Sequence, residues 1–593
     1  MMNIIKDRLT SLRRLMERDE IDYYLITSDD YHASEYVHDY FKSRCYMSGF
    51  TGSAGTLVIG RSWAGLWTDG RYFIQAASQL EGTGIELFKS GMPGVPSIRE
   101  HLASVMSEGQ TLAYDGRTVS RSFGTSLASS LEGMNIRILN STDLVDEIWE
   151  NRPAFPSEPI YLLTGKQAGA SRKDKLRQLR DSLDCPLLIA SLDEIAWLYN
   201  YRGDDVLYTP VAMAYTIVSK DMAALYISQD AVSADARTAL EEDGIILKPY
   251  LQIYDDVSRQ FGSDDSPCLQ MDMDTVNEAL TSLAAHPVFK ANPVLMFKAC
   301  KNPVEIDRIR NAHLKDGAAF TRTICRLKNL AASGEQTFIT ELDVSDMILY
   351  DRMDQDGFIS LSFESIAASA EHGAIIHYAP TEETNIHLSR SFLLMDTGAH
   401  YWDGTTDVTR TIAMGPLTEY EKECYTAVLR GNLNLGAAVF PEGTSGQQLD
   451  CLARKQLWEM GLDYNHGTGH GVGYILSVHE GPNRISKTGS STPLKPGMIT
   501  SNEPGVYIEN KFGIRLENLI LCRCREHAPG FLDFETLTLV PFDRDAILPE
   551  RMTREELDIL NDYHARVYDC ISPYLNESER TWLETATAPI SKE

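Results

Sequence analysis

The chain of 593 residues has no uncharged apolar stretch that approaches the roughly 18 residues needed for a membrane-spanning helix. Its first residues, MMNIIKDRLTSLRRLMERDEIDYY, are interrupted by charges every few positions and lack the continuous apolar run of a secretory signal. No long tract of biased composition suggests disorder or a fibre. We therefore expect a compact cytoplasmic protein without a membrane partner.

Basic residues are scarce relative to acidic ones: 55 Lys and Arg stand against 84 Asp and Glu, which gives a formal net charge of -29. A surface of this sign repels nucleic-acid phosphates and anionic lipid head groups, so we expect neither as a partner. The cysteines are scattered singly, apart from Cys522 and Cys524, whose C-x-C spacing is not the usual zinc or redox pairing. This distribution favours a reducing compartment.

The length favours several domains, because one hydrophobic core seldom organises more than about 300 residues. Residues 1–157 begin with an amphipathic helix, followed by the strand-like runs YYLIT, TLVIG and AGLWT. Residues 158–303 repeat this order with a helix over KDKLRQLRDSL, the run PLLIAS, a helix over DEIAWLYNY, and the strands VAMAYTIVS and AALYI. The sequence predicts two α/β domains, and the similarity of LITSDD at 25–30 to LIASLD at 188–193 suggests a duplication.

Residues 304–593 show a different pattern, which predicts a third domain of the α+β class. Asn302-Pro303 offers a helix start, and VEIDRIRNAHLKDGAAFTRTICRLKNL then keeps helical periodicity for longer than any earlier segment. TEYE at 418–421 is a capping-box pattern ahead of a second helix. The strand-like runs of this domain are SFLLMD, DVTRTIAM, GIRLENLILC and FETLTLVPF.

The strongest local signal is MDTGAHYWDGTTDVTRT at 395–411. Asp396 ends one expected strand and Asp407 begins the next after a polar turn that contains glycine, so the two carboxylates can converge across a hairpin. An acidic pair beside a turn is more often a solvated loop or a helix cap. Further ligands must therefore decide whether this pair binds a metal.

Three more candidate ligands follow: His470 in HGTGHGVG, Glu503 in SNEPGVY and Glu517 in GIRLENL. Glycines beside His470, and beside His466 four residues earlier, allow backbone and substrate to approach closely. Either histidine taken alone is better explained by a hydrogen-bonded structural role. Four carboxylates and one imidazole together suit Mn²⁺, Fe²⁺, Co²⁺ or Zn²⁺, and their charge could hold two ions with a shared hydroxide. The set predicts hydrolysis of a stable bond.

These residues resemble the pita-bread metallopeptidases, and within them the long, three-domain Xaa-Pro aminopeptidases, also called aminopeptidase P. The similarity spans essentially the whole chain and rests on several motifs that are specific in combination: SGFTGSAGT, WTDGRYF, LDEIAWLYNYRG, GAIIHYAP, DGTTDVTRT and HGTGHGVG. The resemblance implies creatinase-like α/β domains over residues 1–157 and 158–303, followed by a pita-bread catalytic domain over residues 304–593.

The resemblance also implies an activity and a metal site. The enzyme would hydrolyse the N-terminal Xaa-Pro bond of peptides through a hydroxide that bridges two divalent ions, with Mn²⁺ ahead of Zn²⁺ or Co²⁺. Asp396 would bind one ion, His470 and Glu503 would bind the other, and Asp407 and Glu517 would bind both.

Three further histidines match substrate positions of the family: His377 in IIHYAP, His466 in HGTGHGVG and His479 in SVHEGP. Together with Glu503 they make up the implied catalytic group. The histidines would hold the scissile carbonyl and the proline end of the substrate, and would assist proton transfer. A positioned imidazole is useful there because negative charge develops on the carbonyl oxygen in the transition state.

Arg71 in TDGRYF matches an arginine that, in the family, reaches from one subunit of a homodimer toward the active site of the other. Judged on its own surroundings, a surface ion pair with Asp69 is the simpler interpretation. Arg515 is expected to orient the bridging carboxylates. Tyr378 and Tyr474 are candidates for an apolar wall against the proline ring, although most tyrosines belong to the core.

Three alternatives stay open at this point. A prolidase would use the same five ligands on Xaa-Pro dipeptides, but prolidases are shorter and lack the duplicated N-terminal part. Creatinase has the pita-bread fold without metals, which the five ligand types argue against. Pita-bread modules that bind peptides or histones without catalysis have lost ligands that this sequence keeps.

Overall fold

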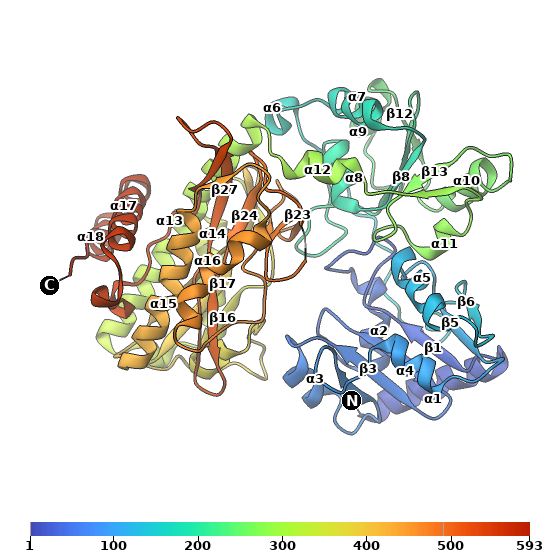
Figure 1. The fold of residues 1–593 in the computed structure, drawn as a ribbon, viewed down its shortest axis with the longest axis horizontal. Coiled ribbons are helices and arrows are strands. Elements are labelled where there is room, and N and C mark those ends of the chain that lie inside the picture. Colours follow the sequence, from blue (N-terminus) through green and yellow to red (C-terminus); the bar gives the residue numbers. More distant parts are fainter. Residues whose placement is uncertain (1, 490, 593) are drawn as a thin grey trace. The chain divides into compact units, whose positions relative to one another are not determined.

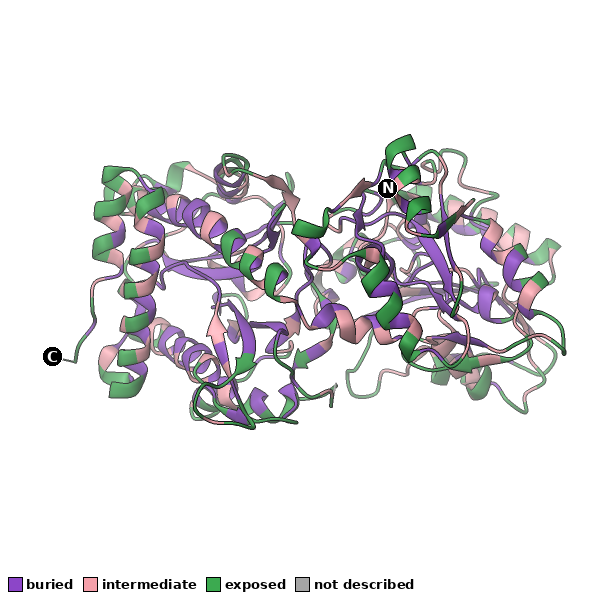
Figure 2. Ribbon diagram, turned by 90° about the horizontal axis from the view of Figure 1, so that it is seen from above, coloured by how far each residue is buried: buried purple, intermediate pink, exposed green. Residues whose placement is uncertain are grey.

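The computed structural model describes residues 2–489 and 491–592 and divides into two compact units. Unit 1 comprises Met1–Leu163 and Ala170–Val294, and unit 2 comprises Thr164–Gly169 and Leu295–Glu593. Strands in both units are mostly buried, and the helices carry the exposed faces (Figure 2). Among the described helices, none combines the length and apolar character needed to span a bilayer.

Unit 1 begins with α1 (Met2–Arg18), which precedes a six-stranded sheet of order β4-β3-β2-β1-β5-β6 (Figure 1). β1 pairs antiparallel with β2 and parallel with β5, and the two outer pairs, β3 with β4 and β5 with β6, are parallel. The strands are β1 (Tyr23–Ile26), β2 (Thr56–Gly60), β3 (Ala64–Thr68), β4 (Glu86–Lys89), β5 (Thr111–Tyr114) and β6 (Arg137–Leu139). Helices α2 (Ser43–Ser48), α3 (Phe73–Gln79), α4 (Ile98–Val105) and α5 (Arg121–Ser130) connect them.

The second sheet of unit 1 has the order β12-β11-β10-β8-β13-β14. Its parallel and antiparallel pairings match those of the first sheet strand for strand, with β8 in the place of β1. Since LITSDD and LIASLD include the ends of β1 and β8, the shared topology supports the duplication suggested by the sequence. The elements are α7 (Arg172–Ser182), β8 (Leu187–Ile189), α8 (Leu192–Leu198), β10 (Ala214–Val218), β11 (Ala223–Ile227), α9 (Ala234–Glu242), β12 (Ile245–Lys248), α10 (Gln252–Phe261), β13 (Leu269–Met271) and β14 (Pro287–Phe289).

Unit 2 contains the long predicted helix, α13 (Pro303–Ser333), which is capped by Asn302 at its N-terminus and by Gly334 at its C-terminus. The Asn302 side chain accepts hydrogen bonds from the first turn, and Gly334 takes the left-handed conformation (φ 77°) that commonly ends a helix. The predicted capping box at Thr418 and Glu421 starts α15 (Glu419–Gly436). The other main helices are α14 (Glu341–Met353), α16 (Gly446–Trp458), α17 (Arg554–Ile571) and α18 (Glu577–Ala586).

The strands of unit 2 form several small sheets and one of six strands, with the order β21-β28-β27-β24-β22-β23. A three-stranded sheet has β17 between β16 and β20. Residues from α15, α17 and the β25-β26 hairpin share one buried core. The strands used below are β16 (Ile366–Ser369), β17 (Phe392–Thr397), β20 (Val408–Ala413), β22 (Gly469–Gly471), β23 (Glu480–Ile485), β24 (Ile499–Asn502), β25 (Gly505–Ile508), β26 (Phe512–Arg515), β27 (Asn518–Cys524) and β28 (Phe531–Thr536).

Two expected strands of unit 2 are shorter than their apolar runs suggest. GIRLENLILC is not one strand, because β26 ends at Arg515 and β27 starts at Asn518, leaving Glu517 in the gap. FETLTLVPF is a strand only to Thr536. In both cases the residues beyond the break bond to other parts of the unit, as Glu517 N–H does to the carbonyl of Thr409 (3.0 Å).

Candidate metal centre

The five predicted ligands all lie at strand ends of unit 2. Asp396 is on β17, Asp407 precedes β20, His470 is on β22, Glu503 follows β24 and Glu517 precedes β27. Asp407, His470 and Glu517 each offer a ligand atom, and these atoms lie within 4.8 Å of one another. The Nε2 atom of His470 lies 3.5 Å from Asp407 Oδ2 and 3.5 Å from Glu503 Oε1. The structure therefore brings together Asp407 and Glu517, which are 110 residues apart in the sequence.

Two oxygen atoms of this cluster are buried without a hydrogen-bond partner among the described residues: Asp396 Oδ1 and Glu517 Oε1. The second oxygen of each carboxylate accepts a hydrogen bond: Asp396 Oδ2 accepts from Arg515 (2.6 Å), and Glu517 Oε2 accepts from Thr409 (2.9 Å). An unpaired buried carboxylate oxygen is costly unless a cation is close to it. Together with the oxygen-rich donor set, these atoms fit divalent metal ions.

Crowding changes the acidity of the cluster. Burial and the neighbouring carboxylates raise the pKa of Asp407 and that of Glu517 well above their usual range. Burial, with Asp396 adding to it, raises the pKa of Glu503 to about 7. Several carboxylates confined in one site repel each other when all are ionised. A bound cation is therefore required for all of them to be ionised at neutral pH.

The raised pKa values predict how pH affects the metal-free protein. Between about pH 4 and pH 7 the folded chain keeps protons on Asp407, Glu503 and Glu517 that the unfolded chain has already lost. The unfolded state then binds fewer protons, so the stability of the metal-free protein falls as pH rises through this interval. Mn²⁺ needs the ionised carboxylates, so the stabilisation it gives should increase over the same range.

Thermal melts of the chelator-treated protein with and without Mn²⁺ at pH 5, 6 and 7 measure this effect. At pH 7, one site with Mn²⁺ at a hundred times its Kd should add about 2.7 kcal/mol to the free energy of unfolding. An equal rise in Tm at pH 5 and pH 7 would contradict the carboxylate site.

The predicted substrate histidines lie around the same site. The His479 ring contacts that of His470, with centroids 4.3 Å apart and planes at 90°. In His466, Nδ1 donates to the carbonyl of Gly467 (2.7 Å) and Nε2 lies 2.8 Å from the Tyr507 hydroxyl. Burial and the charge of Arg515 lower the pKa of His466 to about 3, so its ring is neutral. A carbonyl can only accept, which fixes the proton of His466 on Nδ1.

His377 is exposed and lies in the segment between β16 and β17. Its charge contributes to the lowered pKa of His466, so the two rings lie close enough to interact electrostatically. The structure thus sets His479 against His470 of the cluster and His466 against Tyr507, with His377 near His466. The roles of these histidines in binding and proton transfer stay predictions.

Arg515 lies beside the carboxylate cluster. It binds Asp396 and not the two carboxylates, Asp407 and Glu517, that it was expected to orient. Its guanidinium donates to Asp396 (2.6 and 3.2 Å) and to the hydroxyl of Tyr507 (2.8 Å), rather than to Asp407. Arg515 acts on Glu517 and Glu503 only through its charge, which lowers the pKa of each. Tyr507 is a further residue of the site that the sequence did not predict, since its one signal is its place two residues after EPG.

The other predicted substrate-binding residues, Arg71, Tyr378 and Tyr474, are bonded to other groups of the protein. In unit 1, Arg71 donates to Asp69 (2.8 and 2.7 Å), the ion pair that its local sequence suggests. The hydroxyl of Tyr378 donates to the buried carboxylate of Glu341 (2.6 Å), and that of Tyr474 donates to the carbonyl of Gln167 (2.7 Å). These bonds explain why both tyrosines are buried, and they leave the proline-binding wall unassigned.

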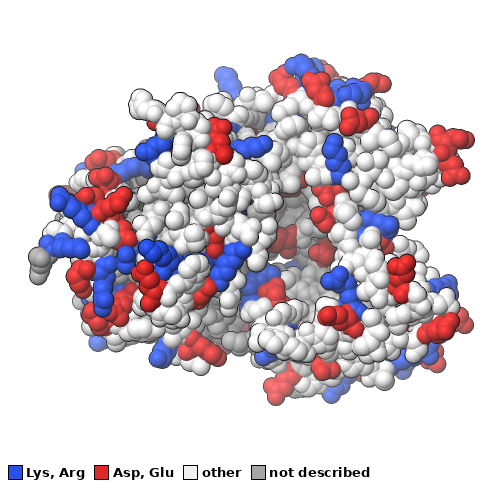
Figure 3. All heavy atoms as spheres, viewed as in Figure 1, with Lys and Arg blue, Asp and Glu red and all other residues white. Residues whose placement is uncertain are grey.

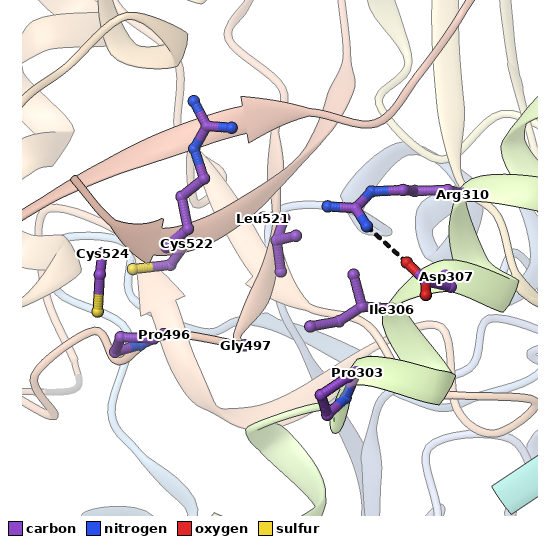
Figure 4. Close-up of a pocket in the computed structure, with 10 residues that line it drawn as sticks. Pro303, Ile306, Asp307, Arg310, Pro496, Gly497, Leu521, Cys522 and Cys524 are labelled. Atoms are coloured by element: carbon purple, nitrogen blue, oxygen red, sulfur yellow. Dashed lines mark hydrogen bonds and ion pairs between the residues drawn. The ribbon is translucent and has the colours of Figure 1, made fainter. Parts of the chain in front are cut away.

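A separate cavity of about 260 Å³ lies between the start of α13 and β27 in unit 2. Figure 4 shows Arg310 there, ion-paired with Asp307 (2.7 Å) beside the apolar side chains of Ile306 and Leu521. None of the predicted site residues lines this cavity. On the face of the protein drawn in Figure 3, acidic and basic side chains are interspersed.

Comparison with known families divides the chain into four matched segments. Residues 307–523 match metallopeptidase family M24, and residues 530–590 match the C-terminal region of peptidase M24. Residues 8–148 and 151–305 each match a creatinase/prolidase N-terminal domain. The fold is therefore two creatinase-like α/β domains followed by a pita-bread domain.

Similarity to individual proteins extends over the whole length. Aminopeptidase P2 of Arabidopsis thaliana is 39% identical over 637 aligned residues, which cover 99% of this chain and 89% of that protein. A probable Xaa-Pro aminopeptidase P of Sordaria macrospora is 38% identical, covering 98% of this chain and 99% of its own. The crystal structure of the X-prolyl aminopeptidase from Caenorhabditis elegans, described as a cytosolic enzyme with a di-nuclear active site, matches with 33% identity and a TM-score of 0.94, covering 99% of this chain and 100% of that one.

Proposed function

The chain belongs to the Xaa-Pro aminopeptidase branch of metallopeptidase family M24, and we propose that it removes the N-terminal residue from peptides whose second residue is proline. The observation that carries this proposal is the buried cluster of four carboxylates with His470, in which Asp396 Oδ1 and Glu517 Oε1 are unpartnered among the described residues. Such a set needs cations, and the relatives with this family signature are peptidases.

Two divalent ions, Mn²⁺ first and Zn²⁺ or Co²⁺ as alternatives, would supply Lewis acidity and a nucleophile at neutral pH. Asp407 and Glu517 would share both ions, since the ligand atoms of these two residues and His470 lie within 4.8 Å of one another. Asp396 would hold one ion, with Arg515 fixing the orientation of its carboxylate (2.6 Å). His470 and Glu503, whose side chains meet at 3.5 Å, would hold the other.

The remaining residues would bind the substrate and move the proton. His377 and His479 are exposed beside the cluster, where they can donate to the oxygen of the scissile carbonyl. Glu503 has a pKa of about 7 in the metal-free site, which suits a group that takes up a proton and returns it to the leaving nitrogen. His466 would support the site through its bonds to Gly467 and Tyr507 and contact the proline end of the substrate.

Substrate length tests this function against the prolidase alternative. We expect Xaa-Pro-Yaa tripeptides to be cleaved at the Xaa-Pro bond with a kcat/KM at least about tenfold above that of Xaa-Pro dipeptides, because contacts beyond proline add to transition-state binding. The matching Xaa-Ala-Yaa peptide serves as the control and should resist cleavage. A preference for dipeptides would replace this proposal with a prolidase.

We also propose that the protein is a cytosolic homodimer, in which Arg71 of one subunit approaches the active site of the other. It is supported by the TDGRYF motif around Arg71 and by the cytosolic C. elegans relative. Sedimentation at micromolar concentration should give a species of twice the chain mass. A single species of 66.3 kDa would contradict the dimer.

A further inference from the structure

The two glutamate ligands occupy opposed positions in one antiparallel hairpin. Asn502 at the end of β24 pairs with Asn518 at the start of β27, and Gly505 at the start of β25 pairs with Arg515 at the end of β26. The residue numbers of both pairs have the same sum, so the register continues unbroken between the two sheets. In that register, Glu503 faces Glu517 directly.

Glu503 and Glu517 make no backbone bond to each other, whereas beside them the N–H of Leu516 donates to the carbonyl of Pro504 (3.2 Å). The N–H of Glu503 donates to the carbonyl of Thr468 (2.8 Å), and the N–H of Glu517 donates to that of Thr409 (3.0 Å). Two carboxylates placed opposite each other on neighbouring strands repel, and here no backbone bond between the two glutamates opposes the repulsion. Proline has no N–H with which to return the bond from Leu516, so the carbonyl of Leu516 needs a donor from outside the hairpin.

The side chain of Asn432 supplies this donor and bridges the two strands that carry the glutamates. Asn432 is buried on α15, and its carboxamide N–H groups donate to the carbonyls of Asn502 (2.8 Å) and Leu516 (3.1 Å). Each of these carbonyls belongs to the residue immediately before a glutamate ligand. The Asn502 amide returns a bond to the backbone carbonyl of Asn432 (2.8 Å), so the contact is reciprocal.

The strand that carries Glu517 is also held by Arg410. Its fully buried guanidinium donates to the carbonyls of Thr409 (2.8 Å) and Glu517 (2.5 Å). It also reaches the side chain of Asn518 (2.8 Å), the residue next to Glu517. Arg410 holds Glu517 alone, whereas Asn432 contacts the strands of both glutamates.

We propose that Asn432 is a positioning residue that sets the separation of Glu503 and Glu517, so that the two carboxylates are spaced for divalent ions before any ion binds. This inference rests on the metal site proposed above. Helix α15 is part of the buried core of unit 2, so it provides a fixed point from which the amide can hold both strands. Without the amide, two buried carbonyls lose their donor and the two charged ends can move apart.

The test is a titration of chelator-treated protein with Mn²⁺ alone, followed by isothermal calorimetry, for wild type, Asn432→Asp and Asn432→Ala. Asn432→Asp keeps the shape but removes both N–H donors. We expect the Kd for Mn²⁺ to rise by about 10- to 100-fold, as for other partners that orient metal ligands. At saturating Mn²⁺, kcat on an Xaa-Pro-Yaa peptide should recover, because the bonds of Asn432 go to Asn502, Leu516 and Asn518 and not to a ligand carboxylate.

The matched control is Asn434→Ala on the same helix, since the Asn434 amide binds Glu556 (3.0 Å) and not the ligand strands. Its Kd for Mn²⁺ should match that of wild type even if its Tm falls. A wild-type Kd in either folded Asn432 variant would overturn the inference, whatever the Tm. If wild type itself binds no Mn²⁺, the proposed metal centre fails, and this inference fails with it.

Discussion

Asp407→Ala should lose at least one Mn²⁺ per chain and nearly all peptidase activity, with kcat reduced on the order of 10³-fold or more. The expected loss is large because Asp407 would serve both ions, and groups that act as a unit fail together. The Asp407 side chain is buried, its Oδ2 lies 3.5 Å from His470 Nε2, and its ligand atom lies within 4.8 Å of that of Glu517.

Folding should survive this substitution, because burial and like charges already disfavour the ionised form of Asp407 in the metal-free protein. Metal analysis, steady-state kinetics and a thermal melt of the chelator-treated variant measure the three quantities separately. Asp356→Ala, which removes a fully exposed carboxylate of the same unit, is the matched control and should keep metal and activity. Full metal content with normal turnover in Asp407→Ala would refute a dinuclear site at these residues.

His377→Ala should lower kcat on an Xaa-Pro-Yaa peptide by about 10²- to 10³-fold, or roughly 3 to 4 kcal/mol, while both metal ions stay bound. The size of this loss follows from the removal of one preorganised donor to the developing oxyanion. His377 is exposed and makes no part of the carboxylate cluster, so metal affinity should be unchanged.

His387→Ala is the control for that experiment, because His387 is also an exposed histidine in the segment between β16 and β17. It should leave kcat near that of wild type. A structural His377 would instead give a Tm lowered by the loss of about 1 kcal/mol with near-normal kcat, and that result would remove it from the mechanism.

The sequence predicted secondary structure best where the signal is local. Strand runs such as YYLIT, TLVIG and AALYI appear in the structure within one residue of their expected bounds, because each is a short β-branched or aromatic segment between turns. The helix after Asn302 and the capping box at Thr418 were likewise predictable, since their signals are local. The five ligands could be inferred from residue type and setting, whereas the roles of the three histidines came from motif resemblance. The structure brings Asp407, His470, Glu503 and Glu517 together and sets His479 against His470.

Contacts that depend on distant segments could not be predicted. The break between Arg515 and Asn518 lies inside an apolar run, and it exists because Glu517 bonds to Thr409 on another strand. The bond of Arg515 to Asp396 joins residues 119 positions apart. Asn432 gave no local signal, because the residues it binds lie 70 and 84 positions away in the sequence. The domain boundaries near residues 157 and 303 stay predictions.

The unbroken register of the β24–β27 hairpin limits how this segment can vary in length. Side chains alternate between the two faces of a strand, so one residue added to either arm would turn a glutamate to the opposite face. The turn at residues 509–511 is different, because Asn510 already has a positive φ of 56° and the arms are paired up to Ile508 and Phe512 on either side. Insertions are therefore compatible with the ligand geometry at the tip of the hairpin, and are excluded along the arms that lead from the tip to Glu503 and Glu517.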